Sequence, residues 1–321
     1  MPSADPVVTV VLPVRNGDRY VGDALAAIER QTLPPEKFET IVVDDGSIDG
    51  TPDLLASWRE AHPGRRVVLR RGGNGPAAAR NAGIAAARAE WVAFTDADTI
   101  PDELWLEQLL AAGEDADAVE GRVVARAENG APRADVHTLE NETGGQYVTA
   151  NMAYRRATLE RVSGFDESFR DAFLEDSDLA FRVLDSGGRI VFAPDAVVAH
   201  RVIPSSPLGT LRAARKMRWL PLLARKHPAR YRAEIAPRLK PVTRPDAHVL
   251  AGIGGLALLP FGGAPLVAGA LLAANGARVI GRSPRMRVPL REMPTAAAVS
   301  VAIPVAKVGW WLVGWASLRR P

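Results

Sequence analysis

The sequence predicts an α/β fold with a mostly parallel sheet flanked by helices, followed by an all-α membrane-associated region. Two observations support this prediction. Short apolar, β-branched runs alternate with segments of helical periodicity through the first 200 residues, which is typical of a parallel sheet with helices on both faces. Beyond residue 205 the chain becomes basic and then apolar. Its 321 residues are enough for one large domain and an appendage.

The first elements are predicted by composition and spacing. Residues 7–12 form an apolar, β-branched run that Pro13 closes, so we expect a buried strand. Residues 18–31 repeat apolar side chains at helical spacing. Residues 40–43 form a second buried strand, which runs directly into Asp44-Asp45-Gly46-Ser47.

The same alternation continues further along the chain. A helix is expected at residues 51–58, a third strand at 67–69 and an Ala-rich helix at 76–89. Residues 91–94 form a fourth apolar strand, which ends at Asp96-Ala97-Asp98. Two further strand candidates follow, at residues 117–124 and 189–192.

Polar loops follow three of these strands, at Arg15-Asn16, Asp44-Asp45 and Asp96-Ala97-Asp98. In open sheets of parallel strands, ligands bind at the carboxyl ends of the strands. The sequence therefore predicts that the three loops meet at one rim of the sheet and form a binding site.

The net charge of +3 conceals a division along the chain. Residues 201–321 hold 20 Lys/Arg and 3 Asp/Glu, whereas the first 200 residues hold 20 basic and 34 acidic residues. One evenly mixed domain does not show such a division. A basic surface suits nucleic acid or an anionic membrane, and the apolar stretches beside it favour the membrane. We therefore expect a membrane partner and no nucleic acid.

The C-terminal third contains three kinds of segment. Residues 206–248 carry eleven Lys/Arg and two Asp/Glu with apolar residues at helical spacing, which predicts basic amphipathic helices on a surface. Residues 249–277 have no charge, but the Pro- and Gly-rich stretch 260–265 divides them into halves that are short for a span. Residues 295–318 are apolar and end in a Trp-rich segment, like an interfacial aromatic belt.

Topology and compartment follow in part from composition. Two full membrane spans would place the Arg-rich loop 278–291 outside, against the positive-inside rule, and a re-entrant or in-plane arrangement avoids that conflict. Both arrangements stay open. The chain has no cysteine, which excludes disulfides, thiolate metal sites and a Cys nucleophile. The N-terminus lacks a basic region followed by an apolar run, so we expect no signal peptide and a cytoplasmic catalytic domain at the cell membrane.

The candidate metal site is Asp96-Ala97-Asp98. Two carboxylates one residue apart at a strand end can reach one hard cation. The alternative is a solvated turn or a helix cap, but the apolar strand ahead and the neighbouring polar motifs favour a site. His200, which follows the strand-like run 196–199, is a weaker candidate ligand.

Three other motifs carry candidate groups. Asp44 of Asp44-Asp45 could accept a hydrogen bond from a nucleobase, although Asp-Gly is also a common turn. Arg80 lies near a helix that follows a Gly-rich entry, which suits a diphosphate, although a surface Arg is the alternative. Glu175-Asp176 stands at a helix start, where carboxylates often serve only as caps, but adjacent carboxylates can raise one pKa and make Asp176 a general base.

These motifs, taken in order, resemble the family 2 inverting glycosyltransferases of the GT-A fold. Each piece is weak alone, whereas the ordered set, which spans residues 7 to about 200, is specific. The matching pieces are Val10–Asn16, Ile41–Thr51, Ala79–Gly83, Phe94–Asp98, Asn151–Arg156, Gly164–Glu167 and Glu175–Arg182.

The resemblance implies a role for each motif and a nucleoside-diphosphate sugar as donor, with UDP or dTDP as the nucleotide. The nucleotide would contact the motifs that follow the first two strands and the helix that contains Arg80. The metal, Mg²⁺ or Mn²⁺, and the catalytic base would come from the later motifs. Donor-binding residues would be Pro13, Val14 and Arg15 around the nucleoside, Asp44 at the base with Asp45 beside it, Arg80 near the nucleotide and Asp96 at the sugar or ribose. The metal ligands would be Asp98, Asp96 and His200, the catalytic base Asp176, and its support Glu175.

One departure from the family pattern bears on the reaction. Processive members carry Gln-x-x-Arg-Trp after the core, whereas the comparable stretch here, Arg215–Trp219, lacks the Gln. We therefore expect a single transfer rather than polymer synthesis. The acceptor is expected to be a lipid-linked or membrane-proximal hydroxyl, or a glycan, as in cell envelope glycan biosynthesis. The predicted domains are a GT-A-like domain at 1–205, a basic amphipathic region at 206–248 and apolar membrane-associated helices at 249–321.

Two other enzymes and one non-enzyme compete with this interpretation. A haloacid-dehalogenase-like phosphatase also uses Asp-x-Asp after an apolar strand, but that motif normally opens the domain, and here nearly a hundred residues precede it. A sugar-nucleotide pyrophosphorylase would need a Gly-rich loop after the first strand. A catalytically silent membrane-bound glycan-binding protein would have no use for Asp98 and Asp176.

Overall fold

The computed structural model describes residues 5–61, 65–126, 140–202, 206–239, 246–247, 249–251, 253 and 293–318. They belong to two compact units. The first unit holds the described residues up to 202, and the second holds those from 206 onward.

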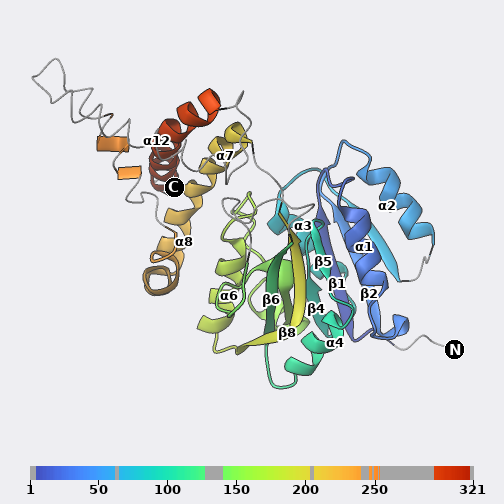
Figure 1. Ribbon diagram of the computed structural model, residues 1–321. Helices are drawn as coiled ribbons and strands as arrows, with labels where there is room; N and C mark the ends of the chain where they lie inside the picture. Colours follow the sequence, from blue (N-terminus) through green and yellow to red (C-terminus); the bar gives the residue numbers. More distant parts are fainter. Residues whose placement is uncertain are drawn as a thin grey trace, which may run out of the picture. The chain divides into compact units, whose positions relative to one another are not determined.

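The first unit is built on an eight-stranded mixed sheet of order β3-β2-β1-β4-β7-β6-β8-β5 (Figure 1). Parallel pairing joins β1 to β2 and to β4, β2 to β3, and β6 to β8. Strand β7 is antiparallel to β4 and β6, and β5 is antiparallel to β8. The strands are β1 (Val8–Val14), β2 (Phe38–Asp44), β3 (Arg66–Arg70), β4 (Trp91–Phe94), β5 (Thr99–Pro101), β6 (Ala118–Arg126), β7 (Met152–Arg155) and β8 (Ile190–Arg201).

Helices cover both faces of this sheet because successive residues of its central strands are buried on opposite sides. Val10 and Leu12 of β1 share one core with Leu25 of α1. Val11, between them, belongs to the other core, with Ala77 of α3. The helices are α1 (Val21–Glu29), α2 (Thr51–Glu60), α3 (Pro76–Ala86), α4 (Trp105–Ala112), α5 (Arg156–Arg161) and α6 (Glu175–Asp185), with the short turns η1 (Pro35–Lys37) and η2 (Thr149–Asn151).

The predicted α/β class with a sheet between helices is confirmed, and most predicted strands lie within a few residues of the observed ones. The prediction missed β5, β7, α4 and α5. Strand β7 has only four residues, Met-Ala-Tyr-Arg, without a β-branched run. It nevertheless lies between β4 and β6, so tertiary pairing rather than local propensity makes it a strand. Its antiparallel direction makes the sheet mixed.

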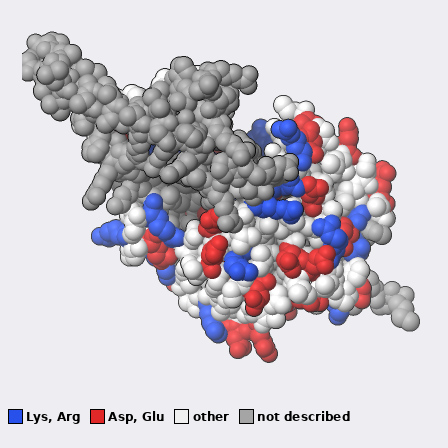
Figure 2. Space-filling model, in the orientation of Figure 1, with Lys and Arg blue, Asp and Glu red and all other residues white. Residues whose placement is uncertain are grey.

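Charges on the first unit are interspersed rather than gathered. On the face shown in Figure 2, acidic and basic side chains alternate over the surface. The acidic excess of the first 200 residues therefore does not form one continuous patch on that face.

The described part of the second unit is helical. Its elements are α7 (Pro207–Ala213), η3 (Ala214–Trp219), α8 (Leu220–Lys226), α9 (Pro228–Arg230), the π-helical η4 (Tyr231–Ile235) and α12 (Met293–Ser317). Helices α7, η3 and α8 pack against α12 (Figure 1). Within α12, residues Ala298–Ser317 are long and apolar enough to cross a membrane. Most of the predicted apolar stretch 249–277 and the Arg-rich loop 278–291 lie outside the described residues.

Packing between α3 and β1 generates a stability prediction. A Cβ added to Gly83 of α3 would lie 2.4 Å from Val11 Cγ1, whereas one added to Gly22 of α1 would meet only Leu54 at 3.7 Å. We expect Gly83→Ala to lower the free energy of unfolding by about 1–3 kcal/mol because β1 cannot yield. Gly22→Ala, the matched control, should be neutral or stabilising by about 0.5–1 kcal/mol. Urea unfolding of the full chain measures both, and equal midpoints would contradict the packing argument.

Candidate active site

Asp44, at the end of β2, is held in place on one side only. It is buried, and its Oδ1 accepts a 2.8 Å hydrogen bond from the Ser47 backbone N–H. Its Oδ2 has no hydrogen-bond partner among the described residues, and Arg70 Nε lies 3.7 Å away. A buried carboxylate oxygen without a donor is costly, so Asp44 is suited to accept an N–H from a ligand.

Asp45 is engaged differently. Its Oδ1 accepts from the Asn74 N–H at 3.0 Å, and its Oδ2 accepts from the Gly75 N–H at 2.8 Å. Gly75 has a φ of 100° and precedes α3, so this carboxylate fixes the turn that opens the helix. These two bonds indicate that Asp45 supports the loop, and its predicted contact with the donor stays a prediction.

The three residues predicted around the nucleoside occupy different environments. Val14 is buried in the core, Pro13 is half-buried and Arg15 is exposed. Asn16 ties the loop after β1 to the loop after β2, because its N–H donates to Ser47 Oγ and its Oδ1 accepts from the Ile48 N–H. Of the three, Arg15 has the freedom to reach a ligand, and its guanidinium lies beside Gly73.

Arg80, on α3, is buried between two carboxylates. Its Nη1 donates to Glu175 Oε1 at 2.8 Å, and its Nη2 donates to Asp96 Oδ1 at 2.9 Å. Its guanidinium also lies 5.6 Å from the centre of the Phe165 ring. Arg80 therefore joins the loop after β4 to the start of α6. Each terminal nitrogen donates one hydrogen bond to a protein carboxylate. The predicted place of Arg80 near a diphosphate stays a prediction.

Asp98 and His200 meet because β5 pairs with β8. The antiparallel register sets Thr99 opposite His200, and Asp98 Oδ2 lies 3.7 Å from His200 Nε2. His200 Nδ1 lies 2.9 Å from the Arg201 carbonyl, which can only accept, so this nitrogen carries the proton. In the neutral imidazole the lone pair of Nε2 then faces a carboxylate. A proton or a bound cation between the two groups would relieve this arrangement.

The acidic side chains perturb one another. Burial, reinforced by Asp96, raises the pKa of Asp98 above its usual range, and the proximity of His200 and Arg201 opposes that rise. Among the described residues, no three acidic or His side chains are arranged to hold a cation by themselves. A metal at Asp98 and His200 would need further oxygen ligands from water or substrate, as Mg²⁺ and Mn²⁺ commonly take from phosphates.

Asp176, in the first turn of α6, is the most perturbed of the predicted residues. Burial raises its pKa to about 7, and the neighbouring Glu175 adds to the rise, whereas the Ser177 N–H and Arg80 oppose it. Glu175 is fully enclosed, and burial raises its pKa despite the ion pair with Arg80. Asp176 is only partly buried and has no ion-pair partner among the described residues. It can therefore exchange a proton with a ligand near neutral pH.

The carboxyl edge of the sheet brings these groups together. Strands β1, β2 and β4 run in one direction, as does β8. Asp44 and His200, in the last residues of β2 and β8, therefore lie at the same edge as Asp96 and Asp98, which follow β4. Ion pairs then join Arg80 and Glu175 to Asp96. The expectation that these loops share one rim is met for the strand ends.

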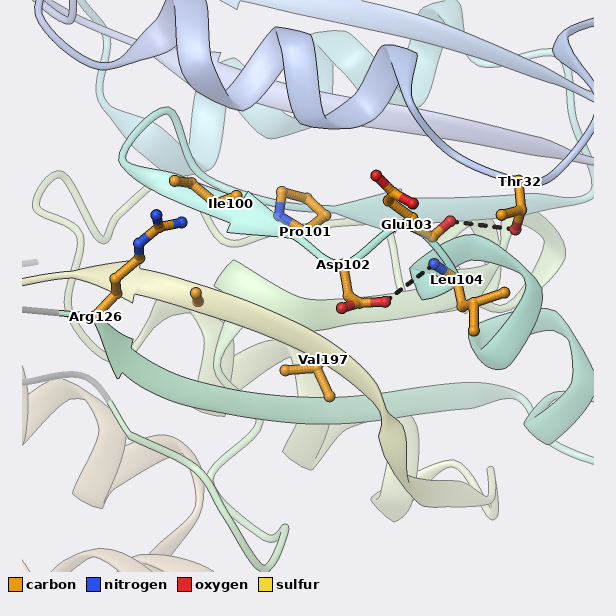
Figure 3. A pocket seen from close by; sticks show the side chains of 9 residues that line it. Thr32, Ile100, Pro101, Asp102, Glu103, Leu104, Arg126 and Val197 are labelled. Carbon is orange, nitrogen blue, oxygen red and sulfur yellow. Dashed lines mark hydrogen bonds between the residues drawn. The ribbon is translucent and has the colours of Figure 1, made fainter.

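A separate hollow of about 560 Å³ lies on the other face of the β5–β8 pair (Figure 3). Ile100, Val197 and Ala199 line it, and they point away from the side that carries Thr99 and His200. Asp102, Glu103 and Arg126 form its polar rim. This hollow is not part of the acidic cluster.

Comparison with known proteins decides the family. The model of glycosyl transferase family 2 matches residues 9–170. The chain belongs to glycosyltransferase family 2. Glycosyltransferase AglE of Haloferax volcanii is 31% identical over 221 residues, which cover 66% of this chain and 71% of that protein. The pre-mycofactocin glycosyltransferase of Mycobacterium tuberculosis is 33% identical over 60% of this chain, but only 42% of its length is covered.

Solved structures agree with this family assignment. The mannosyltransferase PcManGT from Pyrobaculum calidifontis, in complex with GDP-Man and Mn²⁺, has a TM-score of 0.63 at 25% identity, covering 96% of this chain and 88% of that one. S. aureus TarS 1–349 in complex with UDP shares the fold, with a TM-score of 0.51, 18% identity, and coverage of 95% and 91%. The chain is a GT-A-like glycosyltransferase rather than a haloacid-dehalogenase-like phosphatase.

Sequence reasoning missed a further residue of this family 2 domain. Glu120, inside β6, is buried and accepts from the Gly145, Gln146 and Tyr147 N–H groups and from Asn141 Nδ2. It therefore fixes the loop that precedes β7. No sequence signal marks it, because a single Glu in an apolar strand gains its meaning only when the loop folds back onto it.

The raised pKa of Asp176 generates a stability prediction with a definite sign. A folded-state pKa of about 7, against an ordinary value of 3.8, means that the ionised carboxylate costs stability above that pH. We expect Asp176→Asn to raise the free energy of unfolding at pH 8 by about 1–2 kcal/mol, with allowance for partial exposure. The difference should shrink as the pH falls through 7 and vanish near 4. Denaturation at pH 4, 6 and 8 measures it, and a variant less stable than the parent at pH 8 would contradict the assigned environment.

Proposed function

We propose that the chain is an inverting, non-processive glycosyltransferase that moves a sugar from a nucleoside-diphosphate sugar to a hydroxyl at a membrane. The observation that supports this best is the Arg80 bridge. Arg80 pairs with Glu175 and Asp96 and leaves the adjacent Asp176 without an ion-pair partner among the described residues, while burial and the nearby Glu175 raise the pKa of Asp176 to about 7. Such a group suits proton abstraction from an acceptor alcohol.

The proposed reaction is a single displacement. The acceptor hydroxyl gives its proton to Asp176, and its oxygen forms a bond to the anomeric carbon. The bond from that carbon to the diphosphate oxygen breaks, and the electron pair leaves with the nucleoside diphosphate. Attack and departure on opposite faces of the carbon invert its configuration. Glu175 would keep Asp176 in position and maintain its raised pKa.

The leaving diphosphate requires positive charge. Asp98 and His200 fit a divalent ion, because their facing lone pairs lack a proton between them in the neutral imidazole. Asp96, two residues before Asp98, could also reach the divalent ion, although its Oδ1 accepts a hydrogen bond from Arg80. Bound Mg²⁺ or Mn²⁺ would neutralise the developing charge on the diphosphate. The Mn²⁺ held by the mannosyltransferase PcManGT with GDP-Man is consistent with this proposal.

On the donor side, Asp44 would accept an N–H from the base through its unpartnered Oδ2, and Arg15 would lie near the nucleoside. The sequence resemblance favours UDP or dTDP. The solved relatives hold GDP-Man, UDP and UDP-GlcNAc, so the nucleotide is the first property to measure.

Helix α12 is the observation that supports membrane association. Its window Ala298–Ser317 is long and apolar, and 17% of it is buried within the protein, so it is not a core helix. Attachment to a membrane would favour a lipid-linked or membrane-proximal acceptor, and cell envelope glycan synthesis is the setting that this suggests. The missing Gln before Arg218-Trp219 supports a single transfer.

A donor panel tests the reaction class. Purified full chain with Mn²⁺ and a membrane lipid extract should release nucleotide from one donor in preference to the others. Release should rise through a pKa near 7 and fall about tenfold per unit below it, because Asp176 must be ionised. Anomeric analysis of the product by NMR should show inversion, and retention would refute the single displacement.

Two variants and a control separate the assigned roles. Asp176→Asn should lower the transfer rate by about 10²–10⁴-fold, and Asp98→Ala should abolish the response to added Mn²⁺. Asp53→Asn, an exposed acid on α2, should leave both unchanged. If Asp176→Asn transfers within a few-fold of the parent, the base assignment is wrong.

A further inference from the structure

Helix α12 is apolar along almost all of its length, with one side packed on the protein and the other exposed. Its one charged residue, Lys307, turns toward the protein, where Nζ lies 3.1 Å from Asp246 Oδ2. Gly314 is also turned inward, since a Cβ there would lie 2.2 Å from the Arg218 carbonyl oxygen. The opposite side carries large apolar side chains that are 40–54% exposed: Val305, Leu312, Val313 and Trp315. An exposed stripe of this kind marks a contact with lipid or protein.

The helices packed along the inner side of α12 are basic. Arg225 Nη1 donates to the Leu318 carbonyl at 3.0 Å, and Arg218 lies over the rings of Trp219 and Trp310, at 4.5 and 6.0 Å. The α7–α8 stretch thus runs beside the C-terminal half of α12. It carries Arg212, Arg215, Lys216, Arg218, Arg225 and Lys226, and no acidic residue.

This arrangement conflicts with a span through residues 298–317. Placing that window across the hydrocarbon would carry η3 and its three basic side chains to the same depth, where charges are strongly disfavoured. The uncharged part of α12 before Lys307 has 14 residues, which is about 21 Å of helix and too short for a core of about 30 Å. The exposed Trp side chains beside the basic helices instead suit the headgroup boundary.

We propose that the C-terminal half of α12, residues 307–317, lies in the plane of an anionic membrane surface as an interfacial anchor. Its apolar side, with Leu312 and Val313, enters the acyl boundary. The basic α7, η3 and α8 lie on its water side, in the aqueous layer above the lipid headgroups. This inference rests on the membrane association proposed above and specifies its geometry.

The absence of native cysteine allows a clean depth measurement. Single cysteines at Gly309, Leu312 and Ala316, all on the exposed side, would be labelled with a fluorophore in the full chain, reconstituted into vesicles with one-third phosphatidylglycerol. At Gly309 an added Cβ meets nothing within 4 Å. Lipids with a quencher near the headgroup or deep in the chain report depth. An in-plane helix places all three labels at one shallow depth, whereas a span separates Gly309 and Ala316 by about 10 Å.

Two further positions complete the test. Arg215→Cys should react with a membrane-impermeant maleimide as fast as Ser57→Cys, an exposed control on α2, because the proposal keeps η3 in water. Protection of the Arg215→Cys variant from the maleimide, a depth gradient along α12 or no quenching at any α12 label would each overturn the proposal. Nucleotide release by every variant in detergent shows separately whether the enzyme itself is intact. Loss of that activity would count against the proposed function. Only the depth profile tests the interfacial position of α12.

Discussion

The buried guanidinium of Arg80 is the interaction on which the site depends. It is 3% exposed and forms ion pairs with both Glu175 and Asp96, which come from elements far apart in the chain. Without a cation between them, these carboxylates could not share one enclosed site, because removing one partner of a buried ion pair leaves an uncompensated charge. The bridge also explains why Asp176 can be reactive: its neighbour is already paired, and its own carboxylate is left partly open to a ligand.

The sheet fixes the positions of the remaining groups. Parallel β1, β2 and β4 bring the loops after them to one edge, and antiparallel β5 returns the chain so that Asp98 meets His200 on β8. Two other buried carboxylates accept hydrogen bonds from backbone N–H groups and so hold loops in place. Asp45 holds the start of α3, and Glu120 holds the loop before β7. Carboxylates therefore serve two physical purposes in this domain: some hold loops, and others remain available.

The sequence could predict those strands, helices and loops that depend on the composition and spacing of neighbouring residues. The β-branched runs of β1 and β2 and the Ala-rich α3 follow from periodicity and composition, and the acidic loops follow those strands. The spacing of motifs along the sequence could not show which side chains form hydrogen bonds or ion pairs with one another. Whether Arg80 would bind a phosphate or two carboxylates, and whether Asp45 would face a ligand or a turn, depends on which distant elements pack beside them. The sequence prediction missed strand β7 and the role of Glu120 in its loop for the same reason, because both depend on contacts between distant parts of the chain.

The stretch Arg215–Trp219 gains a physical meaning from its surroundings in the second unit. Arg218 stacks on Trp219 and approaches Trp310, and its backbone lies so close to α12 that only Gly fits at position 314. These contacts dock η3 on the side of α12 that carries Gly314, away from the exposed Leu312 and Val313. A segment committed to such packing has its Arg and Trp occupied. The packing of Arg215–Trp219 between the basic helices and α12 is therefore compatible with a single transfer, in which no segment has to bind a growing polymer.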